Sequence, residues 1–136
     1  MPINSRAKGA RGERAWRDKL RSFGYEAERG QQRAGGPDSP DVKCPELNWI
    51  HFEVKCVEAL NIHNAIAQAQ RDAASHQVPV VAHKRNRGQW LVTLQADQFL
   101  NLITCAFQRR FRQELINGKI DDECLAISQN LVKKFN

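Results

Sequence analysis

The sequence lacks the features of a zinc-bound, disulfide-bonded or membrane-embedded protein. Its four cysteines form no C-x-x-C pair, so we expect four reduced thiols and neither a zinc site nor a disulfide framework. No stretch approaches the roughly 20 apolar residues that a membrane helix needs. The basic start of the chain is followed by no apolar segment, so we expect no secretory signal, no membrane partner and a cytoplasmic location.

The chain does have enough apolar material for one domain. Its 136 residues are 41% hydrophobic, and they show no internal repeat and no low-complexity segment. Residues 30–40 are rich in glycine, proline and glutamine, and we expect them to form a loop inside the domain, because both flanking parts are needed for one core. The sequence therefore predicts a single domain over residues 1–136.

Positive charge dominates the chain but is unevenly distributed. The formal net charge is +6 and the isoelectric point is near 9.5, which indicates a polyanionic partner. Residues 1–36 carry a net charge of +5, residues 37–80 carry −3 and residues 81–136 carry +4. An acidic middle between two basic flanks is what a phosphate-binding protein with a cation-binding centre would show.

The spacing of apolar residues predicts an α/β protein. Helices are expected over residues 5–22, 62–76, 97–115 and 121–134. In the first of them, Trp16, Leu20 and Phe23 share the inward face. Strands are expected over residues 25–29, 41–44, 49–57, 78–83 and 89–94. A hairpin-rich start is thus followed by a βαβ crossover, so we expect a mixed central β-sheet flanked by helices, with two C-terminal helices.

The clearest strand, residues 49–57, alternates between two kinds of side chain. One face is apolar and should meet the core, with Ile50, Phe52, Val54 and Cys56. The other face carries Glu53 and Lys55, which emerge together because residues i and i+2 of a strand point to the same side. Charges in a core strand are costly unless they are paired or bind an ion. The alternative is an ordinary ion pair on a half-exposed strand.

A second carboxylate, Asp41, lies 12 residues before Glu53, at the start of the strand predicted over residues 41–44. It can approach Glu53 if the two strands are adjacent. Two carboxylates and the Val54 carbonyl are hard oxygen ligands, which suit Mg²⁺ or Mn²⁺. Asp38, deeper in the preceding loop, is the alternative to Asp41.

The pattern P-D-x11-E-V-K from Pro40 to Lys55 resembles the PD-(D/E)XK nuclease superfamily. Upstream, Gly12-Glu13-Arg14 on the first helix and the basic loop that follows look like the archaeal-type Holliday junction resolvases and related phage nucleases. In some members a glutamine on the next helix faces the site, and Gln68 is the candidate here, with Gln70 as the alternative. The resemblance covers roughly residues 5–95, which leaves residues 96–136 as a C-terminal helical extension.

This resemblance implies a restriction-endonuclease-like core and a metal-dependent DNA endonuclease, a phosphodiester hydrolase that uses Mg²⁺ or, in its place, Mn²⁺. It implies that Asp41, Glu53 and the Val54 carbonyl ligate the metal, and that Glu13 supports the metal directly or through water. Lys55 would position or activate the attacking water in an in-line hydrolysis, with Gln68 facing the site.

Other basic residues are predicted to contact the DNA backbone: Arg11, Arg14, Arg29, Arg33, Lys84, Arg85 and Arg87. For the first four, the alternative is a solvated helix face and loop. For the last three, the alternative is that they only protect the end of a hairpin. The resolvase resemblance implies branched or double-stranded DNA as the partner and a homodimer, because symmetric cutting of two strands needs two sites. The alternatives are a duplex, flap or end-processing nuclease of the same superfamily and a non-catalytic DNA-binding domain of the same fold.

Overall fold

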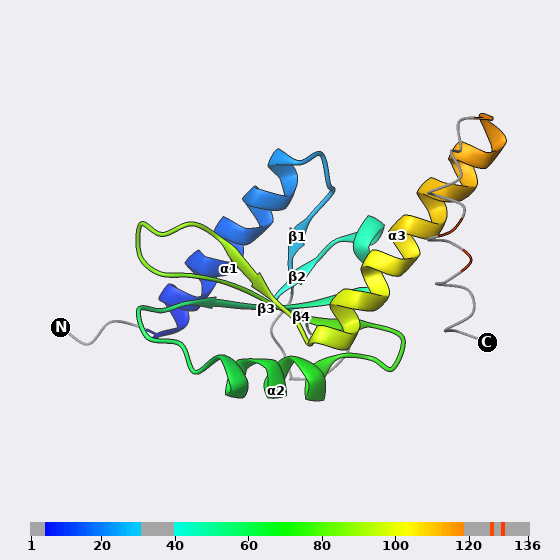
Figure 1. The fold of residues 1–136 in the computed structure, drawn as a ribbon. Coiled ribbons are helices and arrows are strands. Elements are labelled where there is room, and N and C mark those ends of the chain that lie inside the picture. The colour runs from blue at the N-terminus through cyan, green and yellow to red at the C-terminus, as the bar shows by residue number, and fades with distance from the viewer. Residues whose placement is uncertain (1–4, 31–39, 119–125, 127–128, 130–136) are drawn as a thin grey trace. The chain divides into compact units, whose positions relative to one another are not determined.

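The computed structural model describes residues 5–30 and 40–118, together with residues 126 and 129. The chain has two compact units, Met1–Leu94 and Gln95–Asn136. Figure 1 shows the elements of each. The predicted helix over 121–134 falls outside the described residues except for residues 126 and 129, and so do Arg33 and Asp38.

The first unit begins with a long helix and a small hairpin. Helix α1 (Ser5–Ser22) ends before Gly24, whose φ of +88° favours glycine at this position. Strand β1 (Glu28–Arg29) pairs antiparallel with β2 (Val42–Lys43), so both are shorter than the predicted strands. A 3-10 turn, η1 (Pro45–Leu47), which the sequence did not predict, leads to the main sheet.

A mixed three-stranded sheet confirms the α/β class. Strands β3 (Ile50–Cys56), β4 (Val78–Lys84) and β5 (Leu91–Thr93) lie in the order β3-β4-β5. β3 and β4 are parallel and joined by helix α2 (Ile62–Asp72), whereas β4 and β5 are antiparallel. The side chain of Asn61 caps α2 by accepting a hydrogen bond from the Asn64 N–H at 3.1 Å. β3 is thus an edge strand of this sheet.

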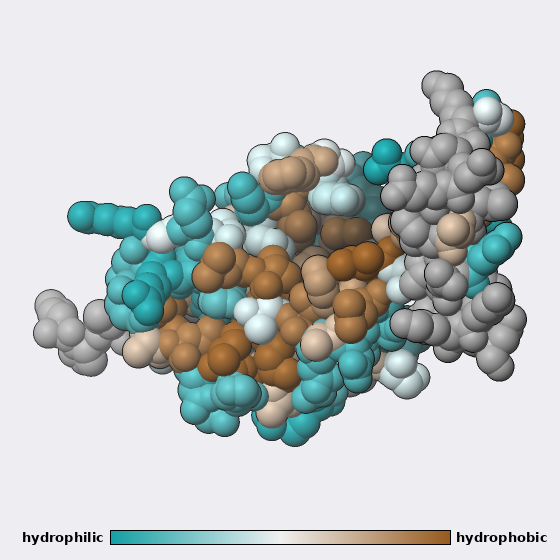
Figure 2. All heavy atoms as spheres, viewed as in Figure 1, coloured by the Kyte–Doolittle hydropathy of each residue, from teal (hydrophilic) through white to brown (hydrophobic). Residues whose placement is uncertain are grey.

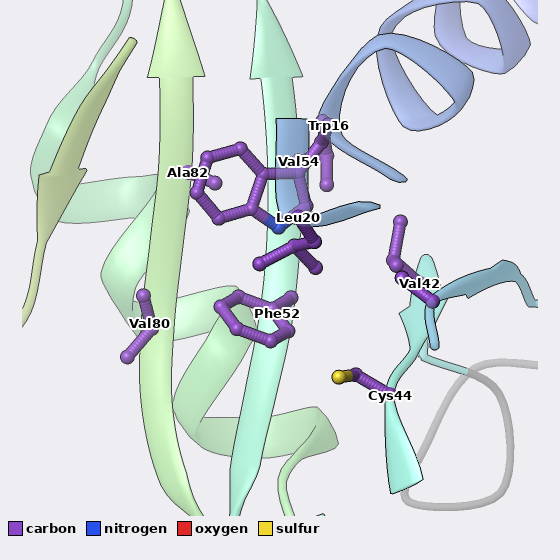
Figure 3. Packing of buried hydrophobic residues seen from close by; sticks show 9 residues of the cluster. Trp16, Leu20, Val42, Cys44, Phe52, Val54, Val80 and Ala82 are labelled. Atoms are coloured by element: carbon purple, nitrogen blue, oxygen red, sulfur yellow. The ribbon is translucent and has the colours of Figure 1, made fainter. Parts of the chain in front are cut away.

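Two helices cover opposite faces of the sheet, and each builds part of the core (Figure 1). On the α1 face, Trp16 packs edge-on against Phe52 and tilted against Trp90, with ring centroids 5.6 and 5.0 Å apart. Figure 3 shows Trp16 and Leu20 lying over Phe52 and Val54. On the other face, small residues of α2, Ala65 and Ala69, pack against Val81.

Both faces of β3 are covered, and one prediction about side-chain direction was wrong. His51 and Glu53, on the polar face of β3, are only 1% and 5% exposed, because α2 covers that face. Phe23 was expected inward, but it is 72% exposed. It lies beyond the end of α1, with the Lys19 ammonium 5.2 Å from its ring centroid.

Apolar side chains also remain at the surface. Figure 2 shows apolar residues gathered over the strands of the first unit, and on β5 the side chains of Leu91 and Val92 are 59% and 50% exposed. In the second unit, helix α3 (Ala96–Ile116) stacks Phe107 on Phe111 with centroids 6.3 Å apart. None of the described helices is long and apolar enough to cross a membrane.

The contact of α1 with β3 depends on one glycine, which gives a stability prediction. A Cβ atom on Gly12 would lie 2.9 Å from the Cys56 sulfur, whereas one on Gly9 would meet nothing within 4 Å. Gly12→Ala should lower the free energy of unfolding by about 1–3 kcal/mol through overpacking. Gly9→Ala, the control on the same helix, should raise it by about 0.5–1 kcal/mol. Urea unfolding measures both, and equal effects of the two substitutions would contradict this packing.

Candidate active site

A cavity of about 350 Å³ opens beside β3, and it brings together residues from four parts of the first unit. Helix α1, the start of β2, strand β3 and helix α2 all contribute to its wall. The site candidates around it are Glu13, Asp41, Glu53, Val54, Lys55 and Gln68. Residues separated by more than 50 positions in the sequence are therefore gathered at one place.

Asp41 is held at the free edge of β3 by backbone contacts. The Val54 N–H donates to one carboxylate oxygen of Asp41 at 2.8 Å, and the Gly30 N–H donates to its carbonyl at 2.9 Å. A Cβ on Gly30 would lie 1.7 Å from the Pro40 oxygen, so the two chain segments can approach this closely only because residue 30 is glycine. This role of Gly30 was not predicted from the sequence, although its place at the edge of the glycine-rich loop is visible there.

The surroundings of Asp41 raise its pKa from 3.8 to about 6. Burial is the largest cause, followed by repulsion from Glu53, and Glu13 adds to it. The hydrogen bond from Val54 and the charge of Lys55 act in the opposite direction but do not cancel these effects. The three carboxylates thus interact electrostatically, and their shared negative charge is only partly compensated.

Lys55 connects the strand carboxylate to helix α2. Its ammonium lies 2.7 Å from a carboxylate oxygen of Glu53 and donates to the Gln68 side-chain oxygen at 3.0 Å. Glu53 is buried, whereas the Lys55 side chain is 28% exposed and reaches the cavity. Of the two candidate glutamines, Gln68 makes this contact, and Gln70 is exposed on α2.

Glu13 is buried on α1 and forms an ion pair with Arg29 on β1. The Arg29 side chain is one-third exposed, and its Nε donates to the Glu13 carboxylate. Arg29, which is predicted to contact DNA, lies against Glu13 in the structure. An Arg beside a buried carboxylate fixes the orientation of that group through a charge-assisted hydrogen bond.

His51 was left out of the site by the sequence analysis, and the structure buries it two residues before Glu53. Its Nδ1 has no hydrogen-bond partner among the described residues. Burial lowers the pKa of His51, although the charges of Asp72 and Asp41 oppose this effect. The alternation of polar and apolar residues in β3 was the visible signal, but only the position of α2 decides that this face is closed.

The other predicted DNA contacts lie at the surface of the first unit. Arg11 and Arg14 are exposed on α1, and Arg85 and Arg87 are exposed in the turn between β4 and β5. Arg87 has a φ of +58°, which fits a tight turn. Lys84 is half-buried, with its ammonium 5.3 Å from the Trp90 ring centroid.

The donor chemistry around the cavity fits a divalent cation. Carboxylates and a backbone carbonyl are hard oxygen donors, and the raised pKa of Asp41 shows that a further positive charge would be stabilising there. In the described residues, no three His, Cys, Asp or Glu side chains stand close enough together to form a metal cluster. The fit therefore rests on the type of donor and on the charge.

Comparison with known proteins gives one match. The model of a family described as "Phage putative PDDEXK endonuclease" matches residues 4–136, nearly the whole chain. No curated protein and no solved structure matches.

The raised pKa of Asp41 predicts how stability depends on pH. Because the folded-state pKa of about 6 exceeds the value of 3.8 expected when unfolded, the folded chain binds more protons between these values. This contribution should therefore lower the free energy of unfolding as the pH rises from about 4 to 6. One pKa unit corresponds to about 1.4 kcal/mol, so the full loss amounts to about 3 kcal/mol.

Asp41→Asn should remove this loss, since a neutral amide can still accept from the Val54 N–H. We expect the variant to be more stable than the parent at pH 7.5, with a smaller difference at pH 4. Urea unfolding in EDTA across this range measures it, with Asp18→Asn as an exposed control. A difference between parent and Asp41→Asn that does not change with pH would contradict the assignment.

Proposed function

Because the chain belongs to this family of PD-(D/E)XK endonucleases, we propose that it is a Mg²⁺-dependent hydrolase of DNA phosphodiester bonds that acts on branched or recombination intermediates. The observation that carries the proposal is the cavity beside β3. It gathers Glu13, Asp41 and Glu53 with Lys55, so that acidic oxygens and the Lys55 ammonium face the same space. Mn²⁺ is expected to replace Mg²⁺, since both prefer oxygen donors.

In this proposal, Asp41, Glu53 and the Val54 carbonyl hold the divalent cation. The cation supplies positive charge that stabilises the phosphate oxygens as negative charge builds up on them. The chain's own contribution is to fix the donors: the Val54 N–H orients Asp41, and Arg29 holds Glu13 on α1. Glu13 then supports the site directly or through water.

Lys55 is proposed to orient the attacking water and to offset charge on the phosphate. Glu53 and Gln68 hold its ammonium from two elements, β3 and α2, which limits the positions it can take. Gln68 is thereby a positioning residue, because its described contact is to Lys55 and not to a reacting atom. A flexible four-carbon side chain needs such support to act at a defined point.

The DNA backbone is proposed to follow basic residues of the first unit: Arg11, Arg14, Lys84, Arg85 and Arg87, with Arg29 acting from its place beside Glu13. Arg33, outside the described residues, belongs to the same proposal. The net charge of +6 supports a polyanionic ligand. Phosphate contacts position a protein on DNA without reading its bases, which suits selection by DNA structure.

A homodimer is proposed because a branched intermediate is resolved by two symmetric cuts. Apolar side chains in the second unit support an interface there. Five described residues of α3 are about half or more exposed: Phe99, Leu100, Ile103, Leu115 and Ile116. A cytoplasmic location follows from the same proposal, since DNA is the substrate.

Cleavage of defined DNA substrates tests the function. Labelled four-way junction, flap, duplex and single-stranded DNA would be incubated with Mg²⁺, Mn²⁺ or EDTA. We expect paired, metal-dependent nicks in the junction, and a loss of roughly 100-fold or more in rate for Lys55→Ala. Lys43→Ala, an exposed lysine on β2, is the control and should cut like the parent.

If flap or duplex DNA is cut and the junction is left intact, the nuclease activity is supported and the proposed preference for branched DNA is wrong. Binding without cutting of any substrate would favour a non-catalytic DNA-binding domain. Equal rates for Lys55→Ala and Lys43→Ala would overturn the role given to Lys55.

A further inference from the structure

A pair of lysines flanks the candidate active site at the carboxyl end of β3. Gly12 places α1 against Cys56, since a Cβ there would lie 2.9 Å from the Cys56 sulfur. Lys8 precedes Gly12 by four residues on α1, so it lies on the same face of the helix, one turn closer to the N-terminus. Lys8 is half-buried and lines the same cavity as Glu13, Asp41 and Glu53.

Lys84 reaches this place from the neighbouring strand. In the parallel ladder Lys84 is the register partner of Cys56, so the two side chains leave the sheet on the same face. The ring of Trp90 lies 5.3 Å from its ammonium, and Trp90 in turn packs on Trp16. A cation over an aromatic face is held in place without losing its charge.

Both lysines lie beside Cys56 at this end of β3. Lys8 lines the same cavity as Cys56, and Lys84 is paired with Cys56 in the parallel ladder. In the described part of the chain neither lysine forms an ion pair with a carboxylate, although four other basic side chains, including Lys55 and Arg29, do. Among the described residues, both lysines therefore lie next to Cys56 without an ion pair to a carboxylate.

The space around these lysines continues from the candidate active site. A second cavity, of about 410 Å³, is lined by His83, Lys84 and Arg85, and Val57 lines both this cavity and the first. Burial lowers the pKa of His83, whose Nε2 lies 2.9 Å from the Thr93 hydroxyl. A strand of linked phosphates could therefore run from the carboxylates past Val57 without leaving the surface cavities.

We propose that Lys8 and Lys84 together bind the phosphate group next to the scissile one on the same DNA strand. This proposal rests on the proposed nuclease function. It adds Lys8, which the motif does not include, and it assigns Lys84 to a defined position. Two ammonium groups on one phosphate oxygen pair give charge-assisted hydrogen bonds, which are stronger than neutral ones.

The test pairs each lysine with one phosphate charge. A single methylphosphonate, which removes one backbone charge, would be moved stepwise along a DNA substrate around the cut. For the parent protein we expect one neighbouring position at which the modification weakens binding and cleavage roughly tenfold. Lys8→Gln and Lys84→Gln should each weaken the binding and cleavage of unmodified DNA by a similar factor.

The decisive result is the loss of sensitivity in the variants. If the lysines bind that phosphate, the methylphosphonate at this position should weaken binding by Lys8→Gln or Lys84→Gln only a little further. The interaction that it removes is already absent from these variants. Lys19→Gln, on the opposite end of α1, is the control and should keep the full sensitivity of the parent. Thermal unfolding checks that all variants are folded. Variants that stay as sensitive as the parent at every position would overturn the subsite.

Binding, measured by fluorescence anisotropy in EDTA, separates failure of the subsite from failure of the nuclease. If the parent cleaves DNA but both variants keep its full sensitivity to the methylphosphonate, the nuclease proposal holds and the subsite proposal is wrong. If the variants lose the sensitivity in binding as expected, but no DNA is cleaved, the phosphate-binding site holds and the nuclease proposal is wrong. No binding of any DNA by the parent removes both.

Discussion

The hydrogen bond from the Val54 N–H to the Asp41 carboxylate is the contact on which the candidate site depends. β3 pairs with β4 along one edge only, so backbone groups on its other edge are available to side chains. Asp41 uses one of them, and this brings a carboxylate from the β1–β2 hairpin beside the strand that carries Glu53 and Lys55. The close contact of Gly30 with Pro40 fixes the hairpin where Asp41 can reach.

Burial of several charges follows from this arrangement and explains its chemistry. Glu13 and Glu53 are almost fully buried, and Arg29 and Lys55 lie against them and offset part of the cost of burying their charge. Burial and repulsion from Glu53 raise the pKa of Asp41 to about 6. A site of this kind is less stable alone than with a positively charged ligand, which is the usual cost of a preformed binding site.

Local sequence patterns predicted much of the first unit. Apolar periodicity predicted α1, α2 and the three strands of the main sheet to within a few residues, because this signal acts over short distances. The ordered pattern of Glu13, Asp41, Glu53 and Lys55 also allowed the superfamily to be identified from the residues. What periodicity could not predict depends on tertiary contacts.

Three examples show this limit. The burial of His51 and Glu53 results from α2 lying on the second face of the sheet, which the alternation in β3 does not encode. The choice of Gln68 over Gln70 depends on how α2 is rotated against Lys55. Phe23 fits the helical stripe in spacing, but the helix ends just before it and leaves the ring exposed.

The central claim is that Asp41 and Glu53 together bind one divalent cation. Calorimetric titration of the parent protein with Mn²⁺ at pH 7.5, and of Asp41→Asn and Glu53→Gln beside it, tests this most directly. We expect one Mn²⁺ site in the parent, and in both variants no binding or binding at least tenfold weaker. In the parent itself, binding should weaken below pH 6, where Asp41 takes up a proton. Binding of equal strength in all three proteins, or none in the parent, would contradict it.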